Sequence, residues 1–188
     1  MSLRIPPGLF DSVRSTRLTV IPRFVLFAIG ALAAVFQLCG WLGLRFNMSP
    51  SLPIGIYVVT NAASNLVEFC PPESAATFMI ARGYRPEGVC WDGGAPLLKP
   101  VVARPGDIVD VSSRGIGVNG NFLPNTSQRS FDTKGRPLTA WPEGRFAVAA
   151  GTIWAVSTYN PRSFDSRYFG PIHIASIRAH LRPMVTLW

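Results

Sequence analysis

An uncharged apolar run near the amino terminus constrains this chain more than any other feature. Residues 24–44 read FVLFAIGALAAVFQLCGWLGL, which is 21 residues without a charge and with Gln37 as the one strongly polar side chain. As a helix the run measures about 31 Å, and the hydrocarbon core of a bilayer is about 30 Å thick. We therefore predict that residues 24–44 form a transmembrane helix.

A cleaved signal peptide is the alternative explanation of this run. Its apolar region would be about 7–15 residues long and would be followed by small residues at a cleavage site. Here the run is longer, and Trp41 and Leu42 stand near its end. These features favour a permanent anchor.

The charges that flank the run predict its orientation. Four arginines and one acid lie in residues 1–23, whereas the first basic residue after Arg45 is Arg82. Because basic residues stay on the cytoplasmic side of a membrane, we expect a cytoplasmic tail over residues 1–23. Residues 45–188 would then be exported, which in a bacterium means the inner membrane's periplasmic side.

The charge of the exported part gives little support to nucleic-acid binding. The whole chain has a formal net charge of +8, of which residues 1–23 supply +3 and the remainder +5. No basic run or basic helix face stands out in that remainder. A positive domain beside an anionic membrane surface is the simpler interpretation.

Three cysteines bear on the redox environment. Cys39 lies in the apolar run, whereas Cys70 and Cys90 lie in the part expected to be exported, where disulfides form. A bridge between them would stabilise the fold by roughly 3 kcal/mol, and we favour it over free thiols. A metal site is not expected, because His173 and His180 lie far away in the sequence.

The exported part reads as β-structure interrupted by turns. Residues 55–60 and 108–112 have the composition or alternation of strands, and Asn119-Gly120 is a hairpin signal. Residues 145–150 and 152–157 form another apolar pair, joined through Gly151. Seventeen prolines and seventeen glycines argue against long helices.

Composition and sequence context decide the interpretation of two further segments. Residues 124–143 are polar with several glycines and prolines, so we expect a mobile surface loop. Residues 115–120 match G-x-G-x-x-G, but no helical pattern follows and Pro124 comes too soon for a phosphate-binding loop.

As candidate general bases, the two lysines are more informative than the two histidines. A nucleophile needs a base that accepts a proton near neutral pH, and neither histidine lies in a triad motif. Lys99 and Lys134 are the two lysines, and Lys99 lies within APLLKPVVA. Lowering its pKa from about 10.4 to about 7 would cost about 4.6 kcal/mol, which burial can supply. The alternative is a strand lysine whose amine reaches solvent.

The candidate nucleophile comes directly after the apolar run. In NMSPSLPIGIY, residues 47–57, Pro50 and Pro53 restrict the backbone on both sides of Ser51. The Ser49 hydroxyl could join the Ser51 N–H in stabilising an oxyanion. A serine- and proline-rich linker beside the membrane is the alternative.

Four ordered motifs behind the anchor carry a resemblance to a known family. They are SPSLPIGIY, LLKPVVARPGDIVDV, VNG and SFDSRYFGPI. Residues 41–188 thereby resemble the type I signal peptidase superfamily, and in particular the TraF-type conjugative transfer peptidases. The resemblance implies a mostly β, LexA-like catalytic domain behind one transmembrane helix, with no cofactor and no metal.

The resemblance also assigns roles to residues. Ser51 matches the family's nucleophile, Lys99 its general base, and Ser49 the hydroxyl that completes the oxyanion hole. Ser163 matches the serine that orients the lysine amine. A supporting pair beside the site is expected from two residues of the same motif, Asp165 and Arg167.

Departures from ordinary leader peptidases point to the TraF-type branch. Leu52 replaces the usual Met, Pro100 follows the lysine, and Ser157-Thr158-Tyr159-Asn160 opens the last motif. The branch implies a pilin precursor as substrate and components of a conjugative type IV secretion system as partners. Water or an amine of the substrate, which would close a ring, could resolve the acyl-enzyme. The alternatives are a general signal peptidase acting on exported preproteins and a non-catalytic, membrane-anchored secretion-system subunit.

Overall fold

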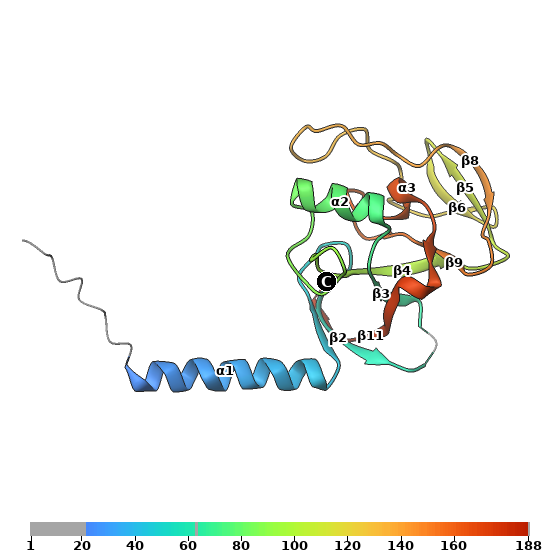
Figure 1. The fold of residues 1–188 in the computed structure, drawn as a ribbon. Helices are drawn as coiled ribbons and strands as arrows, with labels where there is room; N and C mark the ends of the chain where they lie inside the picture. The colour runs from blue at the N-terminus through green and yellow to red at the C-terminus, as the bar shows by residue number, and fades with distance from the viewer. Residues whose placement is uncertain (1–21, 63, 188) are drawn as a thin grey trace, which may run out of the picture. The chain divides into compact units, whose positions relative to one another are not determined.

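The computed structural model describes residues 22–62 and 64–187 (Figure 1). The chain divides into two compact units, one ending at Leu38 and the other beginning at Cys39. Of the predicted cytoplasmic tail, residues 1–21 lie outside the described residues. The second unit contains every candidate site residue.

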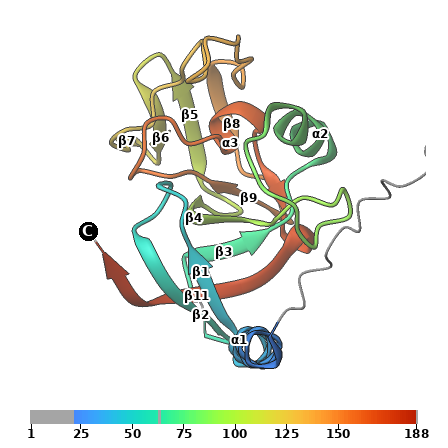
Figure 2. The same ribbon diagram turned by 90° about the vertical axis from the view of Figure 1, so that its left-hand side faces the viewer.

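Two antiparallel sheets build the second unit, which confirms the predicted mostly β class (Figure 2). The larger sheet has the order β1-β2-β11-β3-β4-β9-β10 and the smaller has the order β7-β6-β5-β8. The strands are β1 (Leu44–Asn47), β2 (Ile54–Thr60), β3 (Leu66–Phe69), β4 (Leu97–Ala103), β5 (Ile108–Ser112), β6 (Gly115–Val118), β7 (Asn121–Phe122), β8 (Gly144–Ala147), β9 (Thr152–Ala155), β10 (Ile172–His173) and β11 (Ile177–Leu187).

The local predictions of strands and hairpin are confirmed. The predicted segments 55–60 and 108–112 lie within β2 and β5. Asn119 and Gly120 have φ values of 51° and 84° and connect β6 to β7. Positive φ at both central residues is what a tight two-residue hairpin turn requires.

The predicted pairing of residues 145–150 with residues 152–157 is wrong. The strands in these segments, β8 and β9, join different sheets: β8 pairs with β5, whereas β9 pairs with β4 and β10. The reason lies in β9, whose successive side chains face two separate cores. Ile153 packs into one apolar cluster and Trp154 into the other. Gly151, at φ 78°, turns the chain from one sheet to the next.

A ten-residue helix, α2 (Glu73–Arg82), was not predicted. It begins after Pro72 and ends at Gly83, which takes the left-handed conformation at φ 66°. The disulfide Cys70–Cys90, with a Cα–Cα distance of 5.7 Å, joins the residues before α2 to the segment that leads into β4. Two shorter helices follow β9, namely α3 (Ser166–Phe169) and a 3₁₀ turn (Ile174–Ser176).

The segment 124–143 is a surface loop that lies against α2. Arg82 of α2 donates from Nη1 to the Pro137 carbonyl at 2.8 Å, and Arg136 donates from Nη2 to the Arg82 carbonyl at 3.1 Å. The loop is the orange segment beside α2 in Figure 1. These bonds hold it over the same side of the unit as α2.

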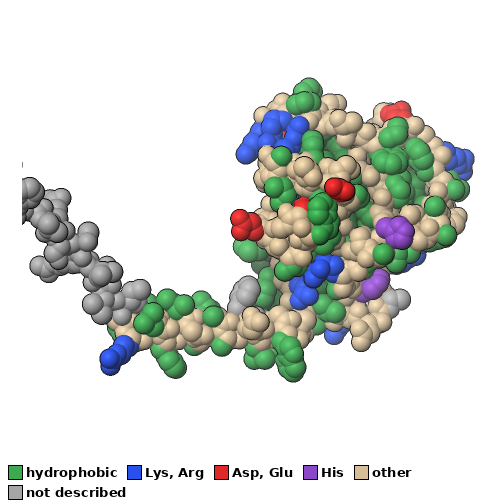
Figure 3. Space-filling model, in the orientation of Figure 1, with side chains coloured by type: hydrophobic (Ala, Val, Ile, Leu, Met, Phe, Trp, Pro, Cys, Tyr) green, Lys and Arg blue, Asp and Glu red, His purple; other side chains and the backbone are tan. Residues whose placement is uncertain are grey.

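Most of the apolar helix α1 (Arg23–Trp41) belongs to the first unit, and apolar side chains stand out along it (Figure 3). Within the described residues it is the one helix long and apolar enough to cross a bilayer. Phe27 and Leu32 are 80% and 69% exposed. The helix ends three residues before the predicted boundary at Leu44, because the chain turns at Gly43 (φ 74°) and enters β1.

Candidate active site

A rigid turn between β1 and β2 carries Ser51. The buried Asn47 side chain organises this turn: its Oδ1 accepts the Ser49 N–H at 3.1 Å. Its Nδ2 donates to the carbonyls of Ser49, Leu52 and Pro53 at 2.9, 3.2 and 3.1 Å. One amide side chain thus replaces the ladder bonds that the turn lacks. Sequence reasoning assigned Asn47 no role, because its partners are backbone groups that no motif displays.

Ser51 lies inside the turn with 8% of its surface exposed. The Ser49 hydroxyl donates to Ser51 Oγ at 3.2 Å, and the Ser51 N–H donates to Ser49 Oγ at 3.4 Å. The Ser157 hydroxyl donates to the Ser51 carbonyl at 2.5 Å and also accepts backbone N–H bonds from its own loop. Ser157 therefore ties the Ser51 turn to the segment after β9. In the sequence, Ser157 is recognisable only as a departure from the leader-peptidase motif, and its bond to the Ser51 carbonyl was not predicted.

Lys99 faces inward from β4. Alternate residues of this strand are buried, and Lys99 lies between Leu97 and Val101 on the buried face. The residue is 4% exposed, and Nζ donates to Ser163 Oγ at 2.7 Å. The structure therefore does not support a strand lysine that reaches solvent.

Burial lowers the pKa of the Lys99 amine to about 8. Removal from water disfavours the ammonium form. The Asp165 carboxylate raises the pKa and the Arg167 guanidinium lowers it, but both effects are smaller than that of burial. At pH 7 about a tenth of the amine is then neutral, compared with less than about a thousandth for an ordinary lysine.

A fully buried ion pair braces the segment that carries Ser163. Arg167 donates from Nε and Nη2 to the two carboxylate oxygens of Asp165, each at 2.9 Å. Arg167 Nη2 also donates to the Ser163 carbonyl at 3.0 Å, and Asp165 accepts the Ser157 N–H at 3.0 Å. The pair thus holds the backbone at Ser163 and Ser157, and its two charges satisfy one another.

A cavity of about 230 Å³ brings the predicted residues together. Ser49, Ser51, Lys99 and Ser163 all line it. Asp165 and Arg167 lie behind it and are fully buried. In the described part of the chain, the hydroxyl of Ser51 bonds to Ser49 and the amine of Lys99 bonds to Ser163, with no hydrogen bond between Ser51 and Lys99 themselves.

The rest of this cavity wall mixes aromatic, aliphatic, polar and charged side chains, and α2 and the 124–143 loop contribute to it. The remaining lining residues are Pro50, Met79, Tyr84, Leu97, Arg129, Phe131, Asp132, Thr133, Leu138, Asn160, Arg162, Phe164 and Tyr168. Burial alone would raise the pKa of the Asp132 carboxyl, but hydrogen bonds from Tyr84 and Arg136 lower it. Asp132 is therefore a carboxylate near neutral pH.

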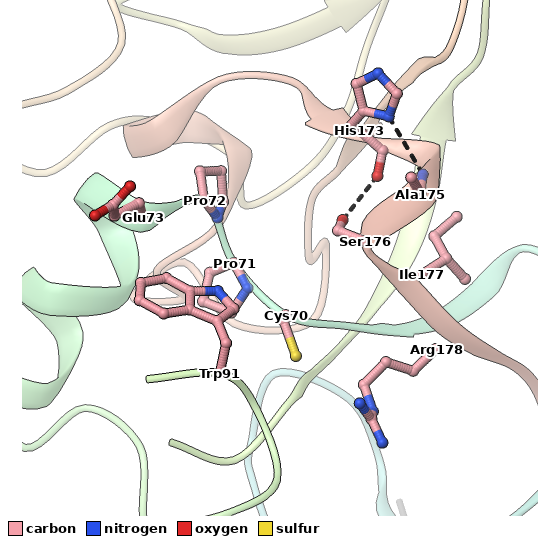
Figure 4. A pocket seen from close by; sticks show the side chains of 10 residues that line it. All are labelled: Cys70, Pro71, Pro72, Glu73, Trp91, His173, Ala175, Ser176, Ile177 and Arg178. Carbon is pink, nitrogen blue, oxygen red and sulfur yellow. Dashed lines mark hydrogen bonds between the residues drawn. The ribbon is translucent and has the colours of Figure 1, made fainter. Parts of the chain in front are cut away.

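A wider and more open cavity of about 890 Å³ lies at the disulfide, where Trp91 and Arg178 face it (Figure 4). Neither Ser51 nor Lys99 lines it. His173 lines this cavity, but its Nδ1 accepts the N–H of Ala175 at 3.3 Å in a local turn. The smaller cavity is the candidate site because it combines a serine hydroxyl with a buried amine, whereas the larger one does not. Within residues 22–62 and 64–187, no group of three His, Cys, Asp or Glu side chains could hold a metal ion.

Several proteins named for plasmid or conjugal transfer are similar to this chain over most of its length. A plasmid transfer protein TraF of Escherichia coli is 34% identical over 86% of this chain and 89% of its own length. A conjugal transfer protein TraF of Agrobacterium tumefaciens (strain 15955) is 34% identical over 87% of this chain and 96% of its own. A conjugal transfer protein TraF of Agrobacterium fabrum is 35% identical over 82% and 88%.

A family-level match covers most of the chain. A crystal structure of a signal peptidase I from Enterococcus faecalis V583 covers 66% of this chain and 99% of its own, at 18% identity and a TM-score of 0.36. Because this identity and TM-score are low, the assignment of the chain to a family depends on the sequence comparisons. The family described as signal peptidase, peptidase S26, matches residues 17–186. The resemblance read from the motifs is confirmed: this chain belongs to the signal peptidase family, peptidase S26.

Proposed function

We propose that this chain is a membrane-anchored serine endopeptidase that processes a pilin precursor for conjugative plasmid transfer. Ser51 is its nucleophile and Lys99 its general base. The observation that carries the proposal is the burial of Lys99: the residue is 4% exposed, its amine is hydrogen-bonded to Ser163, and it lines the same cavity as Ser51. The names of the relatives support a role in plasmid or conjugal transfer.

Proton transfer begins the reaction. A neutral amine has two N–H bonds and one lone pair, so the bond that Nζ donates to Ser163 orients the lone pair within the cavity. The amine takes the Ser51 proton as Oγ attacks the scissile carbonyl. In the Michaelis complex the substrate displaces the Ser49–Ser51 hydroxyl contact, and Ser51 turns toward Lys99.

Charge develops on the carbonyl oxygen in the tetrahedral intermediate. The Ser49 hydroxyl and the Ser51 N–H lie 3.4 Å from one another and serve as its donors. The Lys99 ammonium then protonates the departing amine, which leaves an acyl group on Ser51 Oγ. Water hydrolyses this ester to give a linear product. An amine of the substrate can attack it instead and close a ring.

The membrane arrangement forms part of the same proposal. Residues 1–23 are the cytoplasmic tail, residues 24–44 contain the membrane span, and residues 45–188 are the periplasmic peptidase domain. The excess of arginines before α1 supports this orientation. The Cys70–Cys90 disulfide supports an oxidising compartment for the second unit.

Complementation of a deletion in the chain's own host tests the function. Ser51→Ala and Lys99→Met should each lower pilin processing by about 10⁴-fold or more and abolish plasmid transfer. Lys134→Met is the matched control, because it removes the chain's other lysine, which is exposed. Mass spectrometry of the product distinguishes its fate, since a ring is lighter than the linear peptide by one water.

Each alternative predicts a different result. Intact processing and transfer with both Ser51→Ala and Lys99→Met would favour a non-catalytic secretion-system subunit. Loss of viability on deletion, together with accumulation of many uncleaved preproteins, would favour a general signal peptidase.

A further inference from the structure

Two arginines at the cavity of Ser51 and Lys99 have no partner for their charge among the described residues. Arg129 and Arg162 both line this cavity and are both exposed. Across residues 22–62 and 64–187, neither guanidinium forms an ion pair, a hydrogen bond or a contact with an aromatic ring face. An exposed arginine is ordinary by itself, but two that share one cavity with the proposed nucleophile are not explained by the fold.

The backbones of these arginines, by contrast, are held in place. The Arg129 N–H donates to the Tyr168 hydroxyl at 3.0 Å, and the Arg162 N–H donates to Asn160 Oδ1 at 2.8 Å. Arg162 also directly precedes Ser163, the hydrogen-bond partner of Lys99. Both guanidinium groups therefore extend from anchored points beside the reacting groups.

The cavity supplies no anion to neutralise them. Asp132 is the one acidic residue that lines it in the described part of the chain. This carboxylate already accepts Arg136 Nε at 2.7 Å and the Tyr84 hydroxyl at 2.6 Å, and Arg82 lies 3.7 Å away. The two arginines, together with Lys99 when it is protonated, leave the cavity positively charged.

Other arginines near this cavity do have partners. Arg82 and Arg136 pair with Asp132, and Arg167 pairs with Asp165. Each paired guanidinium holds a segment of the chain, and its removal would leave a polar group unsatisfied. The Arg129 and Arg162 guanidinium groups bond to no segment of the described chain, so they are available to bind a ligand.

We infer that Arg129 and Arg162 bind a carboxylate that the substrate carries within a few residues of its scissile bond. The inference rests on the proposed function and names a feature of its substrate. A guanidinium binds a carboxylate through two parallel N–H bonds, which positions the ligand as well as attracting it. The carboxylate belongs either to an Asp or Glu side chain or to the carboxyl terminus of the substrate.

Quenched-fluorescence peptides with alanine on both sides of the scissile bond test the inference with the full-length protein in detergent. Gln, Glu or Lys is placed in turn at each of three positions on either side, and each peptide is made with a free and an amidated carboxyl terminus. kcat/KM is measured for wild type, Arg129→Gln, Arg162→Gln, the double variant and the control Arg114→Gln. Arg114 is also exposed, but it lies over the Phe122 ring away from this cavity.

We expect Glu to exceed Gln, and Gln to exceed Lys, by about threefold to tenfold at one or more positions. If the chain end supplies the carboxylate, amidation has this effect instead. The preference should shrink in each single variant, vanish in the double variant, persist in Arg114→Gln and weaken as salt is added. Equal rates for Glu and Gln with no effect of amidation, or a preference that survives in the double variant, would overturn the inference.

Binding separates this inference from the proposed function. Fluorescence anisotropy of the same sequences, labelled with the fluorophore but without the quencher, measures charge preference without cleavage. It is measured with Ser51→Ala alone and with Ser51→Ala combined with the Arg129→Gln and Arg162→Gln substitutions. If wild type does not process the pilin precursor in the complementation assay, the proposed function fails, while a preference for Glu in binding that depends on the two arginines still supports the carboxylate site. If wild type cleaves all peptides without charge preference and anisotropy shows none, the function stands and the carboxylate site is wrong.

Discussion

Replacing Lys99 with methionine should stabilise the protein at neutral pH while it abolishes activity. In the folded protein the amine has a pKa of about 8, compared with 10.5 in an unfolded chain. At about 1.36 kcal/mol per pH unit, the difference corresponds to about 3 kcal/mol of unfavourable burial for the ammonium form. Methionine has a similar length and no charge, but Ser163 Oγ loses its donor, which costs about 1 kcal/mol. The net gain is about 2 kcal/mol at pH 7.

The effect depends on pH in a direction that burial determines. The folded pKa lies below the unfolded one, so between about pH 8 and pH 10.5 the unfolded state binds more protons. Wild-type stability therefore rises with pH through this window as the cost of the buried charge disappears. Below pH 8 the cost is fully present. The advantage of Lys99→Met should thus be constant below pH 8. By about pH 10.5 the variant should instead be less stable than wild type by up to about 1 kcal/mol, because the cost of the lost hydrogen bond to Ser163 remains.

Thermal unfolding of the full-length protein in detergent, followed by tryptophan fluorescence, measures this difference. Trp154 is buried in an apolar cluster and reports on loss of the core. A gain of 2 kcal/mol corresponds to about 4–8 °C in Tm for a chain of this size. Lys134→Met is the control and should leave Tm unchanged, since Lys134 is exposed. The reasoning would be refuted if Lys99→Met were less stable than wild type at pH 7. It would also be refuted if the difference in Tm between the two proteins did not change with pH.

Three further predictions follow from the site. kcat/KM for a cleaved peptide should rise tenfold per pH unit below about pH 8 and level off above it, because the neutral form of Lys99 is the base; a rate that is flat from pH 6 to 9 would exclude Lys99 from this role. Ser157→Ala should lower kcat by about tenfold with less change in KM, because the Ser51 carbonyl loses its 2.5 Å bond, and Ser157→Thr should restore part of the loss; equal rates for Ser157→Ala and wild type would show that this bond does not position Ser51. In a Cys39→Ala variant, Lys134→Cys introduces the one free thiol beside the Cys70–Cys90 disulfide, and this thiol should react with a membrane-impermeant maleimide in spheroplasts. Labelling that occurs only after lysis would reverse the proposed orientation of the second unit.

Local sequence patterns predicted much of the fold because they describe interactions between near neighbours. The strand patterns in residues 55–60 and 108–112 and the Asn119-Gly120 turn appear in the structure. The pairing of β8 with β9 was wrong because pairing partners are chosen by packing across the whole unit. Helix α2 was missed because the composition of the entire exported part outweighed the local signals at Pro72 and Gly83.

Of the candidate site, the order of motifs identified the residues and the fold placed them. Ser51, Lys99, Ser49 and Ser163 come from segments up to 114 residues apart, and they line one cavity. The supporting role expected of Asp165 and Arg167 matches their buried ion pair, although their bonds to backbone groups were not foreseeable. The roles of Asn47 and Ser157 depend on carbonyl groups brought near by folding, and no side-chain pattern records them.

By itself the sequence determined the family, the apolar helix and which side chains are proposed to react. These depend on residue type, order and local periodicity, which are properties of the chain before it folds. Tertiary structure alone decided that Lys99 is buried, since a strand lysine becomes a base only when other segments exclude water from it. The same applies to Arg129 and Arg162, whose free charges matter only because folding brings them to the cavity of Ser51. Desolvation and the pairing of charges arise between distant segments, so the site's chemistry is a property of the folded protein.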